Sequence, residues 1–284
     1  MKSDQRGSQV AVAFLAEARW WYAAKVLYPA QALKRAGVPV AAGVMGKMPL
    51  PPRRRGLGVY FSRRYPRPIL LRHSTLHDHL VEEFNRVADV YAEFVEPFSR
   101  PIFDEALPVI AALLGPDSRV LDAGCGPGRE VRRIARLLPR GEVVGIDLAS
   151  RMVTTAHGAA RAAGLDNCAF FQADVGALPR MFAGNFDLVY SCLAHHHYPA
   201  PATATASILR CLRPGGAYCV VDPGPAWYNA LSAPIARLAD PGWIGFHTPE
   251  EFQRLLLDTG FVRAGWLDLL PGYGIAIGQK AVRA

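Results

Sequence analysis

The sequence predicts an α/β fold with a doubly wound, mostly parallel seven-stranded sheet that closes on an antiparallel hairpin. From residue 119 onward, short apolar runs alternate with helix-like stretches, which is typical of a parallel sheet covered by helices. A glycine-rich stretch follows the first of these runs, as in sheets that bind nucleotides. At the end of the chain, FVRAGWLDLLPGYGIAIGQK (261–280) indicates two strands joined by a Pro-Gly turn.

Two helices are expected before the sheet. Residues 78–100 repeat apolar side chains at a helical period, and residues 101–115 form a second helix that ends at Gly115. The sheet then begins with strands at 119–124, 142–147, 168–174, 186–192 and 217–222. Helices are expected at 129–141, 150–165, 202–216 (running into a turn) and 248–260, and residues 223–247 are expected to be irregular. Ser150 and Thr248 are the predicted N-caps.

The charge is unevenly distributed along the chain. Residues 1–77 contain 14 Lys/Arg and two acids, a net charge of +12, so the rest carries −4 of the total of +8. This shift predicts a basic, mainly helical extension at 1–77 and a second domain at 78–284. The extension is interpreted as a lid over an acceptor site, with a membrane-surface or partner-binding arm and a transit peptide as alternatives.

The glycine-rich stretch, VLDAGCGPG (120–128), points to a nucleoside ligand. A phosphate-binding Walker loop needs Gly-Lys-Ser/Thr after its last glycine, but Arg129-Glu130 follows Gly128. A dinucleotide fingerprint needs a glycine at position 129. The pattern is instead D-x-G-x-G-x-G, and an acid at Asp122 suits a ligand with an ammonium group. The next strand ends in Asp147, where a carboxylate would bind ribose hydroxyls.

Over about residues 78–282 the sequence resembles the class I S-adenosylmethionine-dependent methyltransferases, on the small-molecule side that includes quinone-biosynthesis enzymes. The segments that carry the resemblance follow the family's order: FNRVADVYAEF, DAGCGPG, VVGIDLAS, FFQADVGALP, FDLVYSCLAHHHYPAP, LRPGGAYCVVD and FHTPEEFQRLLLDTGF. The resemblance implies S-adenosyl-L-methionine as the cofactor. It also implies cofactor contacts from Tyr91, Asp122, Gly124, Cys125, Gly126, Gly128, Asp147, Leu148, Met152, Asp174, Val175 and Ser191.

Three consecutive histidines, His195, His196 and His197, follow the fourth strand where the methyl group should point. One of them is a candidate general base, and structural hydrogen bonding is the alternative. Ala200 stands where the family usually has an Asp. Because consecutive histidines in a loop are expected to point in different directions, no metal site is predicted.

Several other residues have both a catalytic and a structural interpretation. Asp222 would orient a donor or cap the next segment, and His247 would face the pocket or serve the structure. Cys192 and Ser191 are interpreted as packing residues, because methyl transfer needs no covalent enzyme intermediate. An aromatic lid or ordinary surface packing would explain Trp227, Tyr228, Trp243 and Phe246.

These observations favour methyl transfer to a small, apolar or aromatic acceptor. The alternatives are a non-methylating, pericyclase-like or regulatory protein of the same fold and an RNA methyltransferase, although the Asn/Asp-Pro-Pro-Tyr/Phe loop of base-amino enzymes is missing. Five scattered cysteines without a zinc spacing predict a cytoplasmic protein with reduced thiols, able through residues 1–77 to lie against a membrane or a partner protein.

Overall fold

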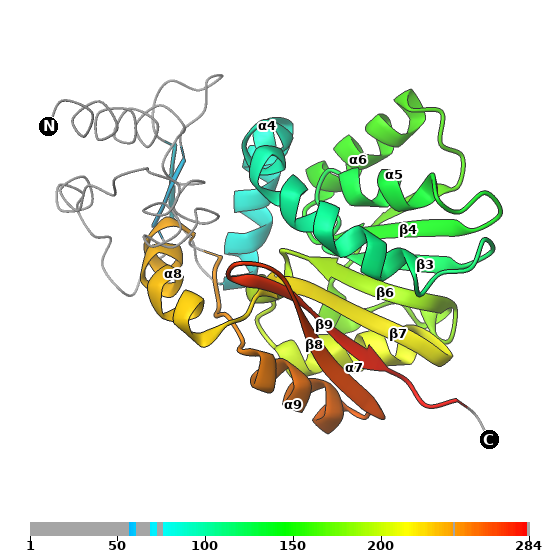
Figure 1. Cartoon of the computed structure of the whole chain (residues 1–284). Helices are drawn as coiled ribbons and strands as arrows, with labels where there is room; N and C mark the ends of the chain where they lie inside the picture. The colour runs from blue at the N-terminus through cyan, green and yellow to red at the C-terminus, as the bar shows by residue number, and fades with distance from the viewer. Residues whose placement is uncertain (1–56, 61–68, 73–75, 241, 283–284) are drawn as a thin grey trace, which may run out of the picture.

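One seven-stranded sheet forms the centre of the computed structural model, which describes residues 57–60, 69–72, 76–240 and 242–282 (Figure 1). The strand order is β5-β4-β3-β6-β7-β9-β8. Strands β5 to β7 pair in parallel, whereas β9 runs antiparallel to both β7 and β8. The predicted fold class is therefore confirmed. The strands are β3 (Arg119–Ala123), β4 (Glu142–Asp147), β5 (Cys168–Gln172), β6 (Phe186–Cys192), β7 (Leu212–Pro223), β8 (Arg263–Leu270) and β9 (Tyr273–Gln279).

Helices cover both faces of the sheet. One layer contains α4 (Leu76–Ala111), α5 (Arg129–Ala135) and α6 (Ser150–Ala162), and the other contains α7 (Pro201–Cys211) and α9 (Pro249–Thr259). Helix α8 (Ala226–Ala239) follows β7. Three short 3-10 turns, η2 (Val175–Ala177), η3 (Arg180–Phe182) and η4 (His195–His197), lie in the connections.

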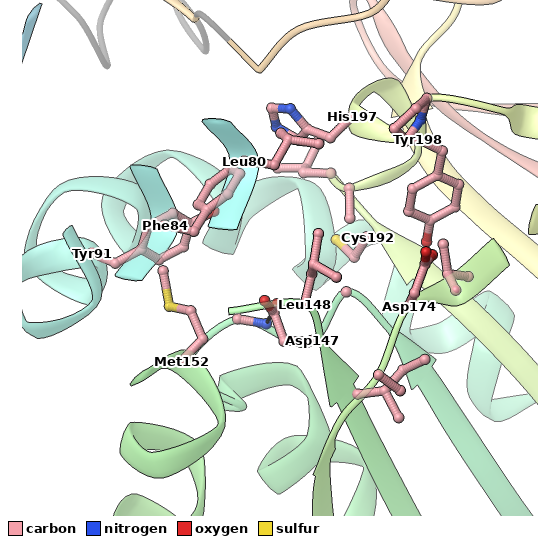
Figure 2. A pocket seen from close by; sticks show the side chains of 18 residues that line it. Leu80, Phe84, Tyr91, Asp147, Leu148, Met152, Asp174, Cys192, His197 and Tyr198 are labelled. Atoms are coloured by element: carbon pink, nitrogen blue, oxygen red, sulfur yellow. Dashed lines mark hydrogen bonds between the residues drawn. The ribbon is translucent and has the colours of Figure 1, made fainter. Parts of the chain in front are cut away.

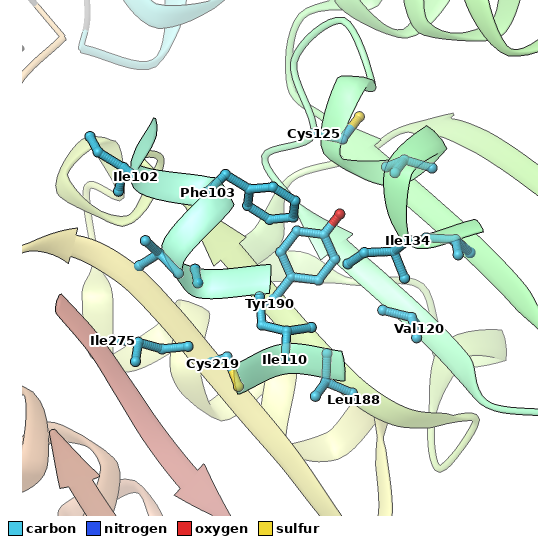
Figure 3. Packing of buried hydrophobic residues seen from close by; sticks show 14 of the residues in the cluster. Ile102, Phe103, Ile110, Val120, Cys125, Ile134, Leu188, Tyr190, Cys219 and Ile275 are labelled. Carbon is cyan, nitrogen blue, oxygen red and sulfur yellow. The ribbon is translucent and has the colours of Figure 1, made fainter. Parts of the chain in front are cut away.

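Alternate residues of each strand supply the two halves of the core. In β3, Val120 packs in the cluster under α4 and α5, whereas Leu121 packs in the cluster under α7 and α9. Figure 3 shows the first cluster, in which Phe103 from α4 lies beside Tyr190 from β6, with ring centroids 6.1 Å apart. Burial of each such side chain contributes about 1.5–3 kcal/mol, so this layer fixes α4 against the sheet.

Some predicted elements differ from the structure. Residues 76–111 form one helix rather than two, although Pro97 and Pro101 lie inside it. Burial of Ile102, Phe103 and Ala106 directly after these prolines offsets the lost backbone hydrogen bonds.

The stretch 223–247, expected to be irregular, contains α8. Its flanking prolines resemble a loop, but Pro225 directly precedes the first helical residue, a place where proline is tolerated. Tyr228 of α8 is fully buried and donates a hydrogen bond to the Tyr273 hydroxyl at 2.7 Å.

The two predicted N-caps have different outcomes. Thr248 caps α9 in a reciprocal capping box with Glu251, as predicted. Ser150 is instead the first residue of α6, and the N-cap is Ala149, whose side chain makes no cap hydrogen bond. The oxygen that caps α6 comes from another helix, as described below.

Of the basic extension at 1–77, the structure describes an antiparallel pair of strands, β1 (Leu57–Tyr60) and β2 (Ile69–Arg72), and the first residues of α4. The predicted helical character of the rest lies outside the described residues. Among the residues that are described, no helix has the length and apolar character needed to cross a membrane.

Candidate functional site

A pocket opens at the carboxyl ends of the central strands, where the strand order reverses between β3 and β6 (Figure 2). This is the position at which doubly wound sheets bind ligands. Its empty volume is about 820 Å³, including the open mouth. Eight of the predicted cofactor residues line it: Tyr91, Gly124, Gly126, Asp147, Leu148, Met152, Asp174 and Val175.

The glycine loop brings bare backbone to this pocket. Gly126 has a φ of +50°, and a Cβ atom there would meet only Tyr91 Cε1, at 3.7 Å, so the loop leaves space for a ligand above it. Gly128 has a different role, because its Cβ would lie 2.7 Å from Phe170 Cε1 and 2.8 Å from Ala156 Cβ. It permits close packing of the loop on α6 and β5, and it is not among the pocket residues.

Asp147, at the end of β4, lines the pocket with a carboxylate that the backbone holds in place. One oxygen accepts the Gly126 N–H and the other accepts the Ala149 N–H, both at 2.9 Å. Burial raises the pKa of this carboxyl, and the backbone donors act in the opposite direction. Each carboxylate oxygen can accept a second hydrogen bond, so Asp147 can accept hydrogen bonds from the two hydroxyls of a ribose.

Asp174 lies on the neighbouring edge of the pocket. Its side chain accepts the Gly176 N–H at 2.7 Å and so caps η2. This bond fixes the carboxylate beside Val175 in the pocket wall.

The amino-terminal part of α4 covers the pocket. Leu80, Phe84 and Tyr91 line it, and Figure 2 shows Met152 of α6 reaching towards the two aromatic rings. Phe84 also packs edge-on against His197, with ring centroids 5.2 Å apart. These apolar side chains would exclude water from a bound ligand.

Asn85 connects the amino-terminal part of α4, which covers the pocket, to α6. Its Oδ1 accepts the Arg151 N–H at 2.8 Å and lies 3.4 Å from Ser150 Oγ, and so caps the amino terminus of α6. Sequence reasoning missed this contact, because the two partners are separated by 66 positions.

Four predicted cofactor residues do not line the pocket: Asp122, Cys125, Gly128 and Ser191. Asp122 is 2% exposed and accepts a hydrogen bond from the Tyr190 hydroxyl at 2.7 Å, within the layer under α4. Burial raises the pKa of Asp122 well above its usual value. A strand alternates its side chains between two faces, and this places Asp122 on the face that α4 and α5 cover.

Tyr198 links the loop after β6 to β3. Its hydroxyl donates to the Ala123 carbonyl at 2.8 Å and lies 3.0 Å from Ser191 Oγ.

The connection after β6 begins at Leu193, which lines the pocket and has a φ of +52°. This is a strained backbone conformation of the kind that clusters at functional sites. Burial raises the pKa of the Cys192 thiol well above its usual value, consistent with a packing role.

The three histidines occupy three different environments. His195 is buried among the rings of Tyr198, His247 and Phe252. Burial, and after it the nearby His247 and His196, lowers the pKa of His195 well below its usual value. Neither of its ring nitrogens has a hydrogen-bond partner among the described residues. The burial and the lowered pKa both favour the neutral form of this ring.

His196 is held by Asp222, the last acid of β7. Its Nδ1 lies 2.6 Å from Asp222 Oδ1, and both side chains are buried. Such a carboxylate fixes the tautomer and the orientation of an imidazole. Sequence reasoning placed both residues at the rim of the site but did not pair them.

His197 lines the pocket and contacts the segment that follows α8. Its Nδ1 lies 3.1 Å from the Gly242 carbonyl, and its Nε2 lies 3.6 Å from Asp240 Oδ2. The rings of His196 and His197 are only 4.3 Å apart. The expectation that consecutive histidines point in different directions is therefore wrong for this pair, because the 3-10 turn η4 brings the two rings to the same side.

The aromatic residues expected to form a lid do not line this pocket. Tyr228 is buried, Trp227 is 47% exposed, and Trp243 packs against Phe246 with ring centroids 5.3 Å apart. Phe246 in turn packs against His196, at 5.4 Å between centroids. Phe246 and Trp243 therefore extend the aromatic cluster that contains His196.

Comparisons with known proteins agree with this site. Residues 114–241 match the family model described as a methyltransferase domain. The nocamycin O-methyltransferase of Saccharothrix syringae is 34% identical over 143 residues, and a ubiquinone biosynthesis O-methyltransferase of Psychrobacter arcticus is 33% identical over 156 residues. Residues 114–241 therefore contain a methyltransferase domain, and over this part of the chain the resemblance to the S-adenosylmethionine-dependent methyltransferases is confirmed.

The two matches with curated relatives span only part of each protein. They cover 50% and 51% of this chain, and 50% and 59% of the two relatives. The solved structure of the [4+2]-cyclase SpnF shares the fold of this methyltransferase, with a TM-score of 0.58 at 18% identity over 74% of this chain and 98% of that one. The cofactor of the family is S-adenosylmethionine.

Proposed function

We propose that this methyltransferase transfers a methyl group from S-adenosylmethionine to a small apolar or aromatic acceptor, most simply at a hydroxyl group. The observation that carries the proposal is the pocket in which Gly126 leaves an open backbone beside the Asp147 carboxylate. Two relatives of this chain bear the names of small-molecule O-methyltransferases, one of them in quinone biosynthesis.

The pocket residues have distinct proposed tasks. Asp147 would hold the ribose hydroxyls, and Asp174 and Val175 would lie against the adenine. When bound, S-adenosylmethionine supplies a methyl group that its sulfonium sulfur makes electrophilic. Leu80, Phe84 and Met152 would exclude water from that part of the pocket. The protein would thus position the two reactants and exclude water. Alignment of two reactants lowers the activation free energy by several kcal/mol.

His196 is the proposed proton acceptor for a hydroxyl substrate. Asp222 engages Nδ1 and thereby directs the lone pair of the ring to Nε2. The rings of His197 and Phe246 pack against this ring, with centroids at 4.3 and 5.4 Å. His195 is a weaker candidate, because its ring is enclosed by apolar and aromatic groups.

Substitution of this base tests the role. His196→Ala is expected to lower kcat by about 100-fold while leaving the affinity for S-adenosylmethionine within a few-fold of the wild type. His157→Ala removes an exposed imidazole of α6 and is the matched control. Equal turnover by His196→Ala and wild type would leave positioning alone as the source of catalysis.

Transfer itself is tested with methyl-labelled S-adenosylmethionine and a panel of hydroxylated aromatic and aliphatic acceptors. Label in an acceptor, together with an equal amount of S-adenosylhomocysteine, is the expected result. Cofactor binding without label transfer to any acceptor would favour the second candidate, a non-methylating protein of the same fold, which the similarity to a cyclase supports.

A further inference from the structure

The imidazoles of His196 and His197 form a cluster with Asp240. The proposed methyl transfer uses His196 as a base but gives no role to His197 or Asp240. His196 and His197 come from η4, whereas Asp240 follows the last residue of α8. One potential ligand atom from each of the three lies within 4.8 Å of the other two, and all three residues are buried. We propose that His196, His197 and Asp240 bind one divalent transition-metal ion, with Zn²⁺ as the best fit.

The ligand types fit zinc. Two imidazoles and one carboxylate are a common set of protein ligands for Zn²⁺, and a fourth position remains for water or an acceptor oxygen. In a tetrahedral site with bonds of about 2.0–2.2 Å, neighbouring ligand atoms lie roughly 3.3–3.5 Å apart. His197 Nε2 and Asp240 Oδ2 are already 3.6 Å apart, so this edge of the site needs little adjustment.

The surroundings of both histidines also match those of metal ligands. A metal-bound imidazole usually donates its other N–H to a carboxylate or a backbone carbonyl, which sets the tautomer. His196 has Asp222 on Nδ1 at 2.6 Å, and His197 has the Gly242 carbonyl on Nδ1 at 3.1 Å. With Nδ1 of each ring carrying the proton for these partners, Nε2 is the nitrogen that would bond to the metal.

A bound ion would also act on the reaction, and this step rests on the proposed function. The His196 lone pair at Nε2 would be used either for the metal or for the proton of the acceptor. Metal occupancy would therefore suppress the base, and the cluster would make methyl transfer sensitive to zinc.

Binding is tested on untagged, chelator-treated full-length protein with Co²⁺ as a spectroscopic probe. Saturation at about one Co²⁺ per chain, with visible d–d bands of a tetrahedral site, is the expected result. His197→Ala and Asp240→Asn should each weaken binding by at least about 100-fold, and Asp222→Asn by about 10- to 100-fold. The exposed His157→Ala and Asp258→Asn are matched controls and should bind like wild type.

Two results would overturn the site: no stoichiometric Co²⁺ binding by wild type, or equal binding by wild type and Asp240→Asn. The effect on the reaction is measured separately. Zn²⁺ should reduce the turnover of wild type reversibly, and Asp240→Asn should need at least about 10-fold more Zn²⁺ for the same reduction. If Zn²⁺ inhibits wild type and Asp240→Asn equally while Co²⁺ binding is weakened in the variants as expected, only the link to methyl transfer is refuted. The Co²⁺ binding result does not depend on turnover of any acceptor.

Discussion

At the scale of single residues, Asp122 shows how burial changes the role of a residue within a motif. Its pattern, an acid two places before the first glycine, suggested contact with the cofactor's ammonium group. The structure instead places it against the Tyr190 hydroxyl in the core, with a pKa raised well above the ordinary 3.8 by burial. The next residues of the motif, Gly124 and Gly126, do reach the pocket.

This raised pKa predicts a pH-dependent stability. The folded state keeps a proton on Asp122 to higher pH than the unfolded state does. The contribution of this carboxyl to the free energy of unfolding is therefore fully present below about pH 4, and it is lost as the pH rises through the pKa of the folded state. Asp122→Asn removes this loss, which amounts to up to about 1.4 kcal/mol per pH unit. Urea unfolding of both proteins at pH 5 and pH 8 measures it. An identical pH dependence in the two proteins would show that Asp122 titrates normally.

The environment of each histidine in the triplet could not be predicted from the sequence. The triplet marks the rim of the site, but the sequence does not rank its members. The 3-10 turn η4 decides that His195 enters the aromatic core while His196 and His197 share one side. Asp240 joins them from 43 positions beyond His197, at the end of a helix that the sequence did not predict.

At the scale of elements, the contact between α4 and α6 connects the cover of the pocket to its floor. Asn85 of α4 caps the first turn of α6, which carries the pocket residue Met152. Removal of this cap is expected to loosen the cover, because a lost N-cap costs about 0.5–2 kcal/mol.

Asn85→Ala should therefore weaken binding of S-adenosylmethionine by about 2- to 30-fold. The neighbouring Arg86→Ala, which removes a partly exposed ion pair with Glu82, is the matched control. Calorimetric titration of both variants checks the prediction. If Asn85→Ala binds as tightly as Arg86→Ala, the capping contact does not control the cover.

The accuracy of the predicted elements follows from local chemistry. The bounds of β4 and β6 agree with the prediction, because each is a short, largely apolar run that is followed by a bend. The sequence pattern predicts two helices in place of α4, because of the prolines inside it. It predicts no helix at α8, because Pro-Gly-Pro (223–225) precedes it. In both regions tertiary burial, of Phe103 and of Tyr228, outweighs the local signal.

At the scale of the whole molecule, the sheet domain contains every residue proposed to bind the cofactor. The sheet and its helices lie between residues 76 and 279, and the cyclase of the same fold is matched over 98% of its length by 74% of this chain. We therefore expect the basic extension, with its net charge of +12, to lie outside the cofactor site.

We expect deletion of residues 1–75 to leave S-adenosylmethionine binding nearly unchanged and to reduce acceptor turnover by at least about 10-fold, as for a lost lid. Circular dichroism of the truncated protein verifies its fold before the two assays. Full turnover on a soluble acceptor would contradict the lid, and a loss confined to salt-sensitive vesicle binding would identify a membrane-surface arm.

The affinity of this protein for S-adenosylmethionine, measured by calorimetry with wild type and Asp147→Ala, tests the central claim most directly. We expect stoichiometric binding by wild type. In the variant, the binding free energy should weaken by about 2–4 kcal/mol, roughly 30- to 900-fold in Kd, because charge-assisted hydrogen bonds to the ribose are removed. The exposed Asp166→Ala is the matched control and should bind like wild type. Unchanged affinity in folded Asp147→Ala, or no binding by wild type, would contradict the assignment of this pocket.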